Sequence, residues 1–183
     1  GIPKSFVETP AKNKNLTQPS DIFAKSLYYN TSEEQQISRL ESLLQPEAFA
    51  NITQRLADSG MRKGFACLFY GAPGTGKTET VLQLARKTGR ALMQVNISSI
   101  KDKYVGESEK NIKNLFDRYR QLVESEPIAP ILFFNEADAI FNKRSENTER
   151  AVDKMENAIQ NIILQEMETL DGILIATTNL TSN

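Results

Sequence analysis

The stretch Gly71-Ala72-Pro73-Gly74-Thr75-Gly76-Lys77-Thr78 decides how this chain folds. It matches the pattern G-x-x-x-x-G-K-[ST] in full. The residues before it, Phe65 to Tyr70, are a short apolar run that predicts a buried strand. The residues after it, Thr78 to Lys87, have the apolar spacing of a helix, and Gly89 is a typical helix stop. The sequence therefore predicts a glycine-rich loop between a strand and a helix, which is the context that the pattern requires.

The residue types in this loop indicate phosphate binding. Glycines let the backbone turn its N–H groups toward an anion, and the N-terminus of the next helix adds a favourable dipole. Lys77 is expected to reach the terminal phosphates, and the Thr78 hydroxyl to ligate Mg²⁺. An ordinary glycine-rich turn is the alternative, and the flanking strand and helix argue against it. The predicted ligands are ATP or ADP with Mg²⁺, bound by Gly71, Pro73, Gly74, Thr75, Gly76, Lys77, Thr78 and Glu79.

Strands and helices alternate through the rest of the chain. Further strands are predicted at 91–97, 131–134 and 172–177, and helices at 107–123 and 152–170. The run Ile131 to Phe134 is wholly apolar, as expected of a strand covered on both faces. This alternation predicts an α/β fold, a three-layer α/β/α sandwich around a parallel sheet.

The N-terminal part has a different character. Residues 1 to about 30 contain three prolines among polar residues and predict an extended arm without regular structure. A short helix with Leu40 and Leu44 on one face follows, Pro46 interrupts it, and a second short helix ends near Gly60. The chain is thus divided into an N-terminal arm with short helices, 1–60, and a nucleotide-binding core, 61–183.

Polar residues follow the apolar strand Ile131 to Phe134, in the order Asn135-Glu136-Ala137-Asp138. The carboxyl end of a buried parallel strand is where ligands bind in open α/β sheets. Glu136 is the candidate base that activates the attacking water, and Asn135 the candidate contact to the metal. The alternative is a solvated helix start, because acids favour a first helical turn. Asn135 can accept a hydrogen bond from a metal-bound water but brings no charge, so we expect it to hold the metal less firmly.

Composition excludes several other functions. The 183 residues carry a formal net charge of −1, which gives no support to nucleic acid as a partner. One cysteine and no histidine exclude a disulfide within the chain, zinc sites built on histidine, and Ser-His-Asp chemistry. The single cysteine also fits a reducing, cytoplasmic location. No apolar run approaches the roughly 20 residues of a membrane span.

Four blocks of the sequence resemble the AAA+ ATPases, a family of ring-forming remodelling motors. In family order, 71–78 is similar to Walker A, Lys103-Tyr104-Val105-Gly106-Glu107-Ser108-Glu109 to pore loop 1, 131–138 to Walker B, and 173–179 to the sensor-1 strand. The resemblance extends from Phe65 to the C-terminus. It implies that the sensor-1 strand lies in the sheet between two other strands. One of them precedes the phosphate loop, and the other precedes Glu136.

The resemblance also implies roles for single residues. Asn179 would help to position the water and read the γ-phosphate, which with Lys77 and Glu136 completes the predicted catalytic set. Tyr104 and Val105 would line the pore of a homo-oligomeric, hexameric ring and grip a protein substrate. Without the resemblance, Asn179 is a turn residue after a strand, and Tyr104 packs at the start of the following helix.

The chain departs from the family at two points. The residue at 135 is usually aspartate, and the chain stops at Asn183, before the arginine fingers, fifth core strand and helical lid. It therefore resembles an AAA+ large subdomain without its lid, and we expect weak hydrolysis from it alone. The predicted function is an ATP-hydrolysing motor that remodels a protein. The alternatives are a nucleotide-gated switch or scaffold, a small-molecule kinase, and a DNA-loading protein or helicase.

Overall fold

The computed structural model describes residues 16–71, 76–97, 107–138 and 151–179. Its elements run in the order β1 (Leu16–Thr17), the short 3-10 helix η2 (Pro19–Asp21), α1 (Thr31–Leu44), α2 (Pro46–Asp58), β2 (Phe65–Tyr70), α3 (Lys77–Thr88), β3 (Leu92–Asn96), α5 (Glu107–Ser125), β4 (Ile131–Asn135), α7 (Ala151–Glu168) and β5 (Ile173–Thr178). Strands and helices alternate from β2 onward, as the apolar spacing predicts. The α/β class is confirmed.

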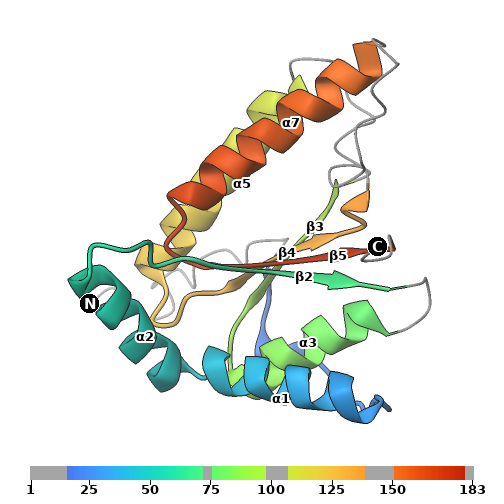
Figure 1. Cartoon of the computed structure of the whole chain (residues 1–183), viewed down its shortest axis with the longest axis vertical. Coiled ribbons are helices and arrows are strands. Elements are labelled where there is room, and N and C mark those ends of the chain that lie inside the picture. The colour runs from blue at the N-terminus through green and yellow to red at the C-terminus, as the bar shows by residue number, and fades with distance from the viewer. Residues whose placement is uncertain (1–15, 72–75, 98–106, 139–150, 180–183) are drawn as a thin grey trace, which may run out of the picture.

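The strands form one sheet in the order β1-β3-β4-β5-β2, and Figure 1 labels β2 to β5. The pairs β3–β4, β4–β5 and β5–β2 are parallel, with Ile131 opposite Ile173 and Phe65 opposite Ile173 on its other side. Strand β5 thus lies between β2 and β4, the position that the family resemblance implies for the sensor-1 strand. The carboxyl ends of these three strands consequently meet at one edge of the sheet.

One expectation about the N-terminal part is wrong in detail. Residues 16–21 are not an irregular arm, since they form β1 and η2. Strand β1 pairs antiparallel with β3, Leu16 opposite Met93, so the sheet is mostly rather than wholly parallel. A two-residue strand is too short to show an alternating pattern. Its pairing covers hydrogen-bonding groups at the edge of β3 that would otherwise be exposed.

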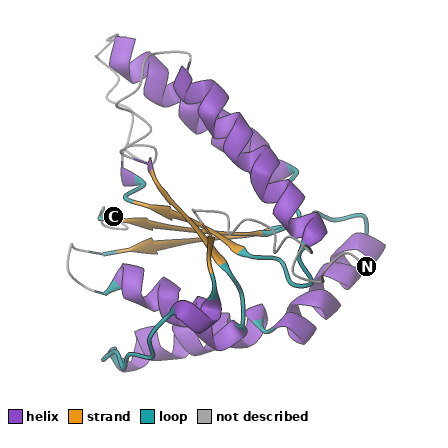
Figure 2. Cartoon of the chain, turned by 180° about the vertical axis from the view of Figure 1, so that it is seen from behind, coloured by secondary structure: helices purple, strands orange, loops and turns teal. Residues whose placement is uncertain are grey.

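Helices cover both faces of the sheet (Figures 1 and 2). On one face, α5 and α7 pack through residues such as Phe116 and Ile163 against Leu132 and Phe134 of β4. On the other face, α3 packs together with Leu40 and Leu44 of α1 against the alternate β4 residues, Ile131 and Phe133. The N-terminal helices therefore share a core with the sheet, and the division at residue 60 stays a prediction.

The helix boundaries follow from local chemistry. The side chain of Asn30 accepts a hydrogen bond from the Glu33 N–H, and Glu33 accepts one in return from the Asn30 N–H, a capping box that starts α1. Pro46 is the first residue of α2, where its missing N–H is no loss. Gly76 and Gly89 flank α3 with φ of 83° and 68°, a left-handed conformation that favours glycine. These boundaries fix where Lys77, the first residue of α3, enters the site.

Candidate nucleotide-binding site

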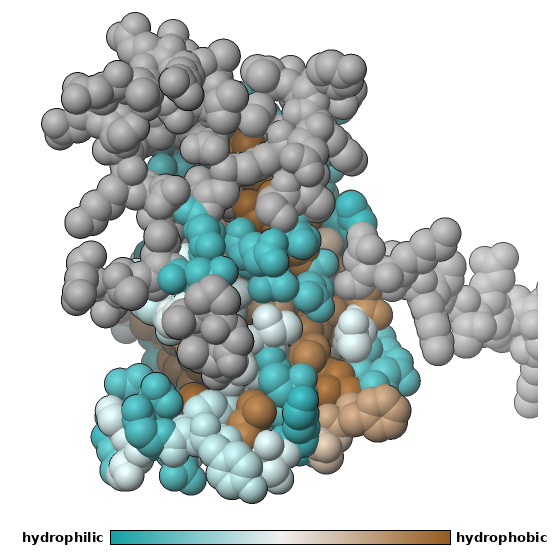
Figure 3. Space-filling model, turned by 90° about the vertical axis from the view of Figure 1, so that its right-hand side faces the viewer, coloured by the Kyte–Doolittle hydropathy of each residue, from teal (hydrophilic) through white to brown (hydrophobic). Residues whose placement is uncertain are grey.

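The predicted site residues gather at the carboxyl edge of the sheet. Gly71 follows β2, Lys77 opens α3, Glu136 follows β4 and Asn179 follows β5. Figure 3 views the molecule from this side, where a band of hydrophilic side chains crosses the described part of the surface. Because ligands of open α/β sheets bind outside the carboxyl ends of the strands, the location fits a ligand site.

Some predicted residues lie outside the described part of the chain. Pro73, Gly74 and Thr75 belong to 72–75, and the predicted pore-loop residues Tyr104 and Val105 belong to 98–106. Of the nucleotide-binding set, the structure describes Gly71, Gly76, Lys77, Thr78 and Glu79.

Lys77 is the residue that joins the loop to the neighbouring strand ends. Its Nζ donates to the carbonyl oxygen of Gly71 at 2.5 Å and to Oδ1 of Asn179 at 3.1 Å. Removal from water lowers the pKa of Lys77, and the nearby charge of Asp138 partly opposes this shift. The predicted phosphate contact and the predicted sensor are thus brought together, although 102 residues separate them in the sequence.

Asp138 holds the end of β5. Its Oδ1 accepts a hydrogen bond from the Thr178 hydroxyl at 2.5 Å and one from the backbone N–H of Asn179 at 2.6 Å. Hydrogen bonds to an ionised carboxylate are among the stronger ones in proteins. The backbone of Asn179 is thereby tied to the segment that follows β4.

Asn135 and Glu136 lie where β4 turns toward that segment. The Asn135 Oδ1 accepts from the Thr177 hydroxyl at 3.1 Å, and the Ala137 N–H donates to the Thr177 carbonyl at 3.0 Å. Glu136 has φ of 55°, a left-handed conformation that costs a residue with a side chain roughly 1–2 kcal/mol. Such strain persists where the surrounding structure enforces it, often at functional sites. Glu136 lies between Asn135 and Ala137, and both of these residues bond to Thr177 of β5, which enforces the conformation of Glu136.

The side chains fit the predicted magnesium site in their chemistry. Thr78 offers a hydroxyl oxygen and Asn135 an amide oxygen, and Mg²⁺ binds hard oxygen ligands, usually few from protein and several from water and phosphate. No group of three or more His, Cys, Asp or Glu side chains that could hold a metal occurs among the residues described.

A segment ahead of the core also contacts α3, which the sequence did not predict. The Gln83 Nε2 donates to the carbonyl oxygen of Phe23 at 2.9 Å, and the Tyr29 hydroxyl lies 2.6 Å from Oγ1 of Thr80. The Thr80 hydroxyl is also within 2.9 Å of the Gly76 carbonyl oxygen. Contacts between single side chains so far apart in sequence leave no periodic signal. Asn30 with Glu33 three residues later is a sequence pattern for the start of the following helix, but it carries no information about these contacts.

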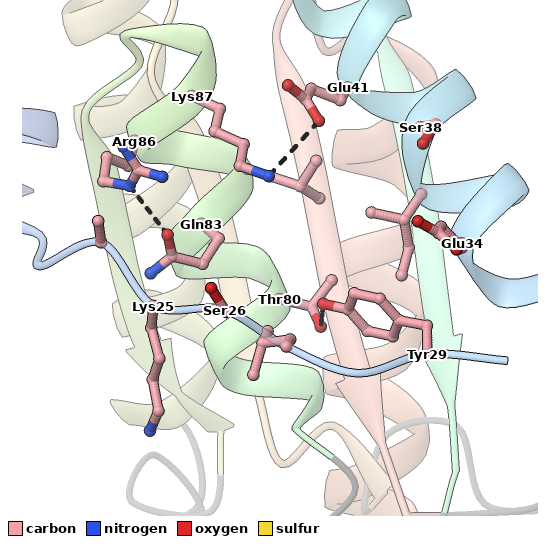
Figure 4. A pocket seen from close by; sticks show the side chains of 14 residues that line it. Lys25, Ser26, Tyr29, Glu34, Ser38, Glu41, Thr80, Gln83, Arg86 and Lys87 are labelled. Atoms are coloured by element: carbon pink, nitrogen blue, oxygen red, sulfur yellow. Dashed lines mark hydrogen bonds and ion pairs between the residues drawn. The ribbon is translucent and has the colours of Figure 1, made fainter.

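This segment crosses a cavity of about 370 Å³ between α1 and α3 (Figure 4). Lys87 and Glu41 form an ion pair across it at 3.9 Å, and Arg86 donates to Gln83 Oε1 at 2.8 Å. Neither Lys77 nor Glu136 lines the cavity, so it is distinct from the phosphate site.

Fold and site together define a nucleotide-binding α/β domain of the phosphate-loop class. Residues 67–183 match the family model described as "ATPase family associated with various cellular activities (AAA)". The chain belongs to this family, and the AAA+ resemblance is confirmed.

Individual relatives agree with this assignment. The chain is 35% identical over 130 residues to 26S proteasome regulatory subunit 7 of Dictyostelium discoideum, covering 71% of this chain and 27% of the relative. It is 32% identical over 128 residues to Peroxisomal ATPase PEX6 of Eremothecium gossypii, covering 70% and 11%. It is 31% identical over 118 residues to ATPase family gene 2 protein homolog B of Bos taurus, covering 64% and 14%. The aligned part of the chain therefore covers about a quarter or less of each of these proteins.

No helix in the described ranges is both long and apolar enough to cross a bilayer.

Proposed function

We propose that this chain is the nucleotide-binding core of an ATP-hydrolysing AAA+ motor that remodels or unfolds a protein substrate. The observation that carries the proposal is the 3.1 Å contact between Lys77 Nζ and Asn179 Oδ1 at the carboxyl edge of the sheet. A cation from the loop and an amide from the sensor strand meet at one point. That pairing supports recognition of a terminal phosphate, because the cation can bind it and the amide can both donate and accept.

The hydrolysis step assigns one task to each residue. In the proposal, the loop amides and Lys77 bind the β- and γ-phosphates of ATP and stabilise charge on the terminal phosphoryl group. Asn179 orients the attacking water, and the Glu136 carboxylate accepts its proton. The oxygen–phosphorus bond to the new oxygen forms as the bond to ADP breaks, which yields ADP and inorganic phosphate.

Thr78 and Asn135 would hold Mg²⁺ in this scheme. The ion would supply charge neutralisation between the β- and γ-phosphates. Thr78 offers its hydroxyl directly, and Asn135 would accept a hydrogen bond from a metal-bound water. The Asn135 oxygen is already shared with the Thr177 hydroxyl, which limits how strongly it can serve this role.

That limitation supports a second candidate, a nucleotide-gated switch or scaffold that binds ATP but scarcely cleaves it. An amide at position 135 brings no negative charge to the metal. The switch would use the same contacts between Lys77 and Asn179 to report which nucleotide is bound. At the nucleotide site, the two candidates differ only in turnover.

Engagement of a protein substrate is the second part of the proposal. The proposal assigns Tyr104 and Val105 to the pore of a homo-oligomeric ring, and it is supported by the similarity to a protein named as a proteasome regulatory subunit. A cytoplasmic location belongs to the same proposal and rests on the single cysteine, Cys67.

Phosphate release by the full-length protein, with Mg²⁺ present, tests the motor proposal. Glu136→Gln should lower turnover by about 100-fold or more, within the range for a lost catalytic base, with little change in nucleotide affinity. Glu126→Gln, an exposed carboxylate after α5, is the matched control and should leave turnover unchanged. Equal turnover in Glu136→Gln and the wild type would remove Glu136 from the mechanism. Nucleotide binding without detectable turnover in either protein would favour the switch.

Ring formation and substrate engagement need a separate test. Light scattering should show a nucleotide-dependent oligomer, and Tyr104→Ala should abolish unfolding of a model protein while ATP turnover persists. Unfolding at the wild-type rate by Tyr104→Ala would contradict the pore assignment.

A further inference from the structure

One carboxylate at the site has no role in the hydrolysis scheme above, namely Asp138. It is half-buried, three residues beyond the end of β4. Both hydrogen bonds to its Oδ1 come from the end of β5, and both are short, 2.5 and 2.6 Å. A single oxygen atom therefore joins the ends of two neighbouring strands.

The residue held in this way is the proposed sensor. Asn179 is exposed and directly follows β5. Asp138 accepts a hydrogen bond from its backbone N–H, while its side-chain Oδ1 meets Lys77. The two contacts use different parts of the residue, so the backbone can stay anchored while the amide changes partner.

The charge of Asp138 also acts on the Lys77 amine, which the Asn179 side chain contacts. It opposes the lowering of the Lys77 pKa that removal from water causes, so it favours the charged amine. Position 135 is neutral in this chain, which leaves Glu136 and Asp138 as the carboxylates on the β4 side of the described site.

We propose that Asp138 is a positioning residue for the sensor: it anchors the backbone of Asn179 so that the amide faces Lys77 and the terminal phosphate. Asp138 acts through Asn179 and touches neither nucleotide nor water. The proposal rests on the proposed function, because it deepens the role of the same site. It predicts selective loss of ATP recognition when the anchor is removed, since only ATP presents a γ-phosphate to Asn179.

Calorimetric titration of the full-length protein with ADP and with the slowly hydrolysed analogue ATPγS, in Mg²⁺, tests this inference. Asp138→Ala should weaken ATPγS binding about tenfold, the effect of losing one or two hydrogen bonds, and change ADP binding by less than about twofold. Asp138→Asn keeps an oxygen acceptor and should stay within about threefold of the wild type for both ligands. Asp58→Ala, which removes an exposed carboxylate at the end of α2, is the control and should change neither.

A double variant separates positioning from a general loss of structure. In an Asn179→Ala background, Asp138→Ala should add less than about a twofold effect on ATPγS, because both changes remove the same contact. Additive effects, equal weakening of both ligands, or an Asp138→Asn as damaged as Asp138→Ala would each overturn the inference. If the wild type binds neither nucleotide, the proposed function itself fails. If it binds both and Asp138→Ala is silent, only the role of Asp138 is lost.

Discussion

Strands β4 and β5 are held at both ends, by contacts of opposite character. At their amino ends, the Tyr119 hydroxyl donates to the Pro130 carbonyl at 2.7 Å and accepts from the Ile173 N–H at 2.8 Å, and Tyr119 is fully buried, with 0% exposed. At their carboxyl ends, the contacts join partly exposed side chains such as Asp138, Lys77 and Asn179. Buried bonds to backbone stabilise the fold, whereas side-chain bonds near solvent can exchange partners with a ligand.

Arg90 strengthens the amino end in the same manner. Its guanidinium donates to the carbonyls of Leu44 and Ala129 at 2.8 and 2.7 Å and lies 5.0 Å from the centre of the Phe49 ring, with only 1% of the residue exposed. Burial lowers its pKa. Arg90 thereby joins the N-terminal helices to the segment that precedes β4. The comparison implies that function and stability can be damaged separately.

Lys77→Ala is expected to give the largest difference between the loss of nucleotide binding and the loss of stability. Loss of the cation that meets the phosphates should weaken ATP binding about 100-fold, or about 2.7 kcal/mol, measured by calorimetry. The melting temperature should stay within about 2 °C of the wild type, since a mostly solvent-facing contact contributes little to folding. Lys113→Ala, an exposed lysine on α5, is the control. Unchanged affinity would remove the basis for every functional assignment made for this edge.

Tyr119→Phe should show the converse. Removing the hydroxyl leaves the Ile173 N–H and the Pro130 carbonyl buried without their partner, which should cost about 2 kcal/mol of unfolding free energy in urea. Nucleotide affinity should change less than about twofold, because the change lies at the opposite ends of the strands. Tyr70→Phe, at a residue that is 50% exposed, serves as the control. A parallel loss of affinity would show that the two ends are coupled.

Alkaline pH is expected to lower the stability of the fold through Tyr119, at the amino ends of the strands. Burial raises the pKa of Tyr119 above its ordinary value of 10.0. Below that value both states keep the phenol proton, so the stabilisation is fully present. Above it the unfolded state loses the proton while the folded state retains it, so stability should fall by about 1.4 kcal/mol per pH unit. Urea midpoints between about pH 10 and 12 should show this slope in the wild type and a shallower one in Tyr119→Phe.

The smallest of these effects is expected for Asn135→Asp. An added charge beside the metal should strengthen Mg²⁺ binding to the nucleotide complex about fivefold, or about 1 kcal/mol. The acceptor for the Thr177 hydroxyl is kept, so the fold should be unaffected. Mg²⁺ titration of ATP turnover measures the change, with Asn114→Asp, exposed on α5, as the control. An Asn135→Asp variant with the wild-type Mg²⁺ dependence would place position 135 away from the metal.

The sequence was most informative where a function needs a fixed local pattern. Glycine, lysine and threonine at a set spacing predict the phosphate loop. The apolar run before Asn135 predicts a strand that is covered on both faces. The order of β2, β5 and β4 came from the family resemblance, because pairing partners along a sheet leave no local trace. The roles of Pro73, Tyr104 and Val105 stay predictions, since they lie outside the described residues.

The side-chain contacts at the amino and carboxyl ends of β4 and β5 could not be predicted from the sequence. Tyr119 counts as one more apolar position on the helix 107–123, and nothing in that spacing indicates that its hydroxyl bonds to Pro130 and Ile173. Asp138 reads as an acid in a first helical turn, although its partners lie 40 residues or more away. Such bonds depend on how two distant backbones meet, which periodicity and composition do not record.

The bond between Tyr29 and Thr80 has a practical consequence. Thr80 also bonds the Gly76 carbonyl, so the Tyr29 hydroxyl is two hydrogen bonds away from the peptide that closes the phosphate loop. The chain has five tyrosines and no tryptophan, so its ultraviolet emission is tyrosine emission. Tyr29 therefore contributes one of five overlapping tyrosine signals, and the difference in emission between the wild type and Tyr29→Phe is the share that reports on this hydrogen bond.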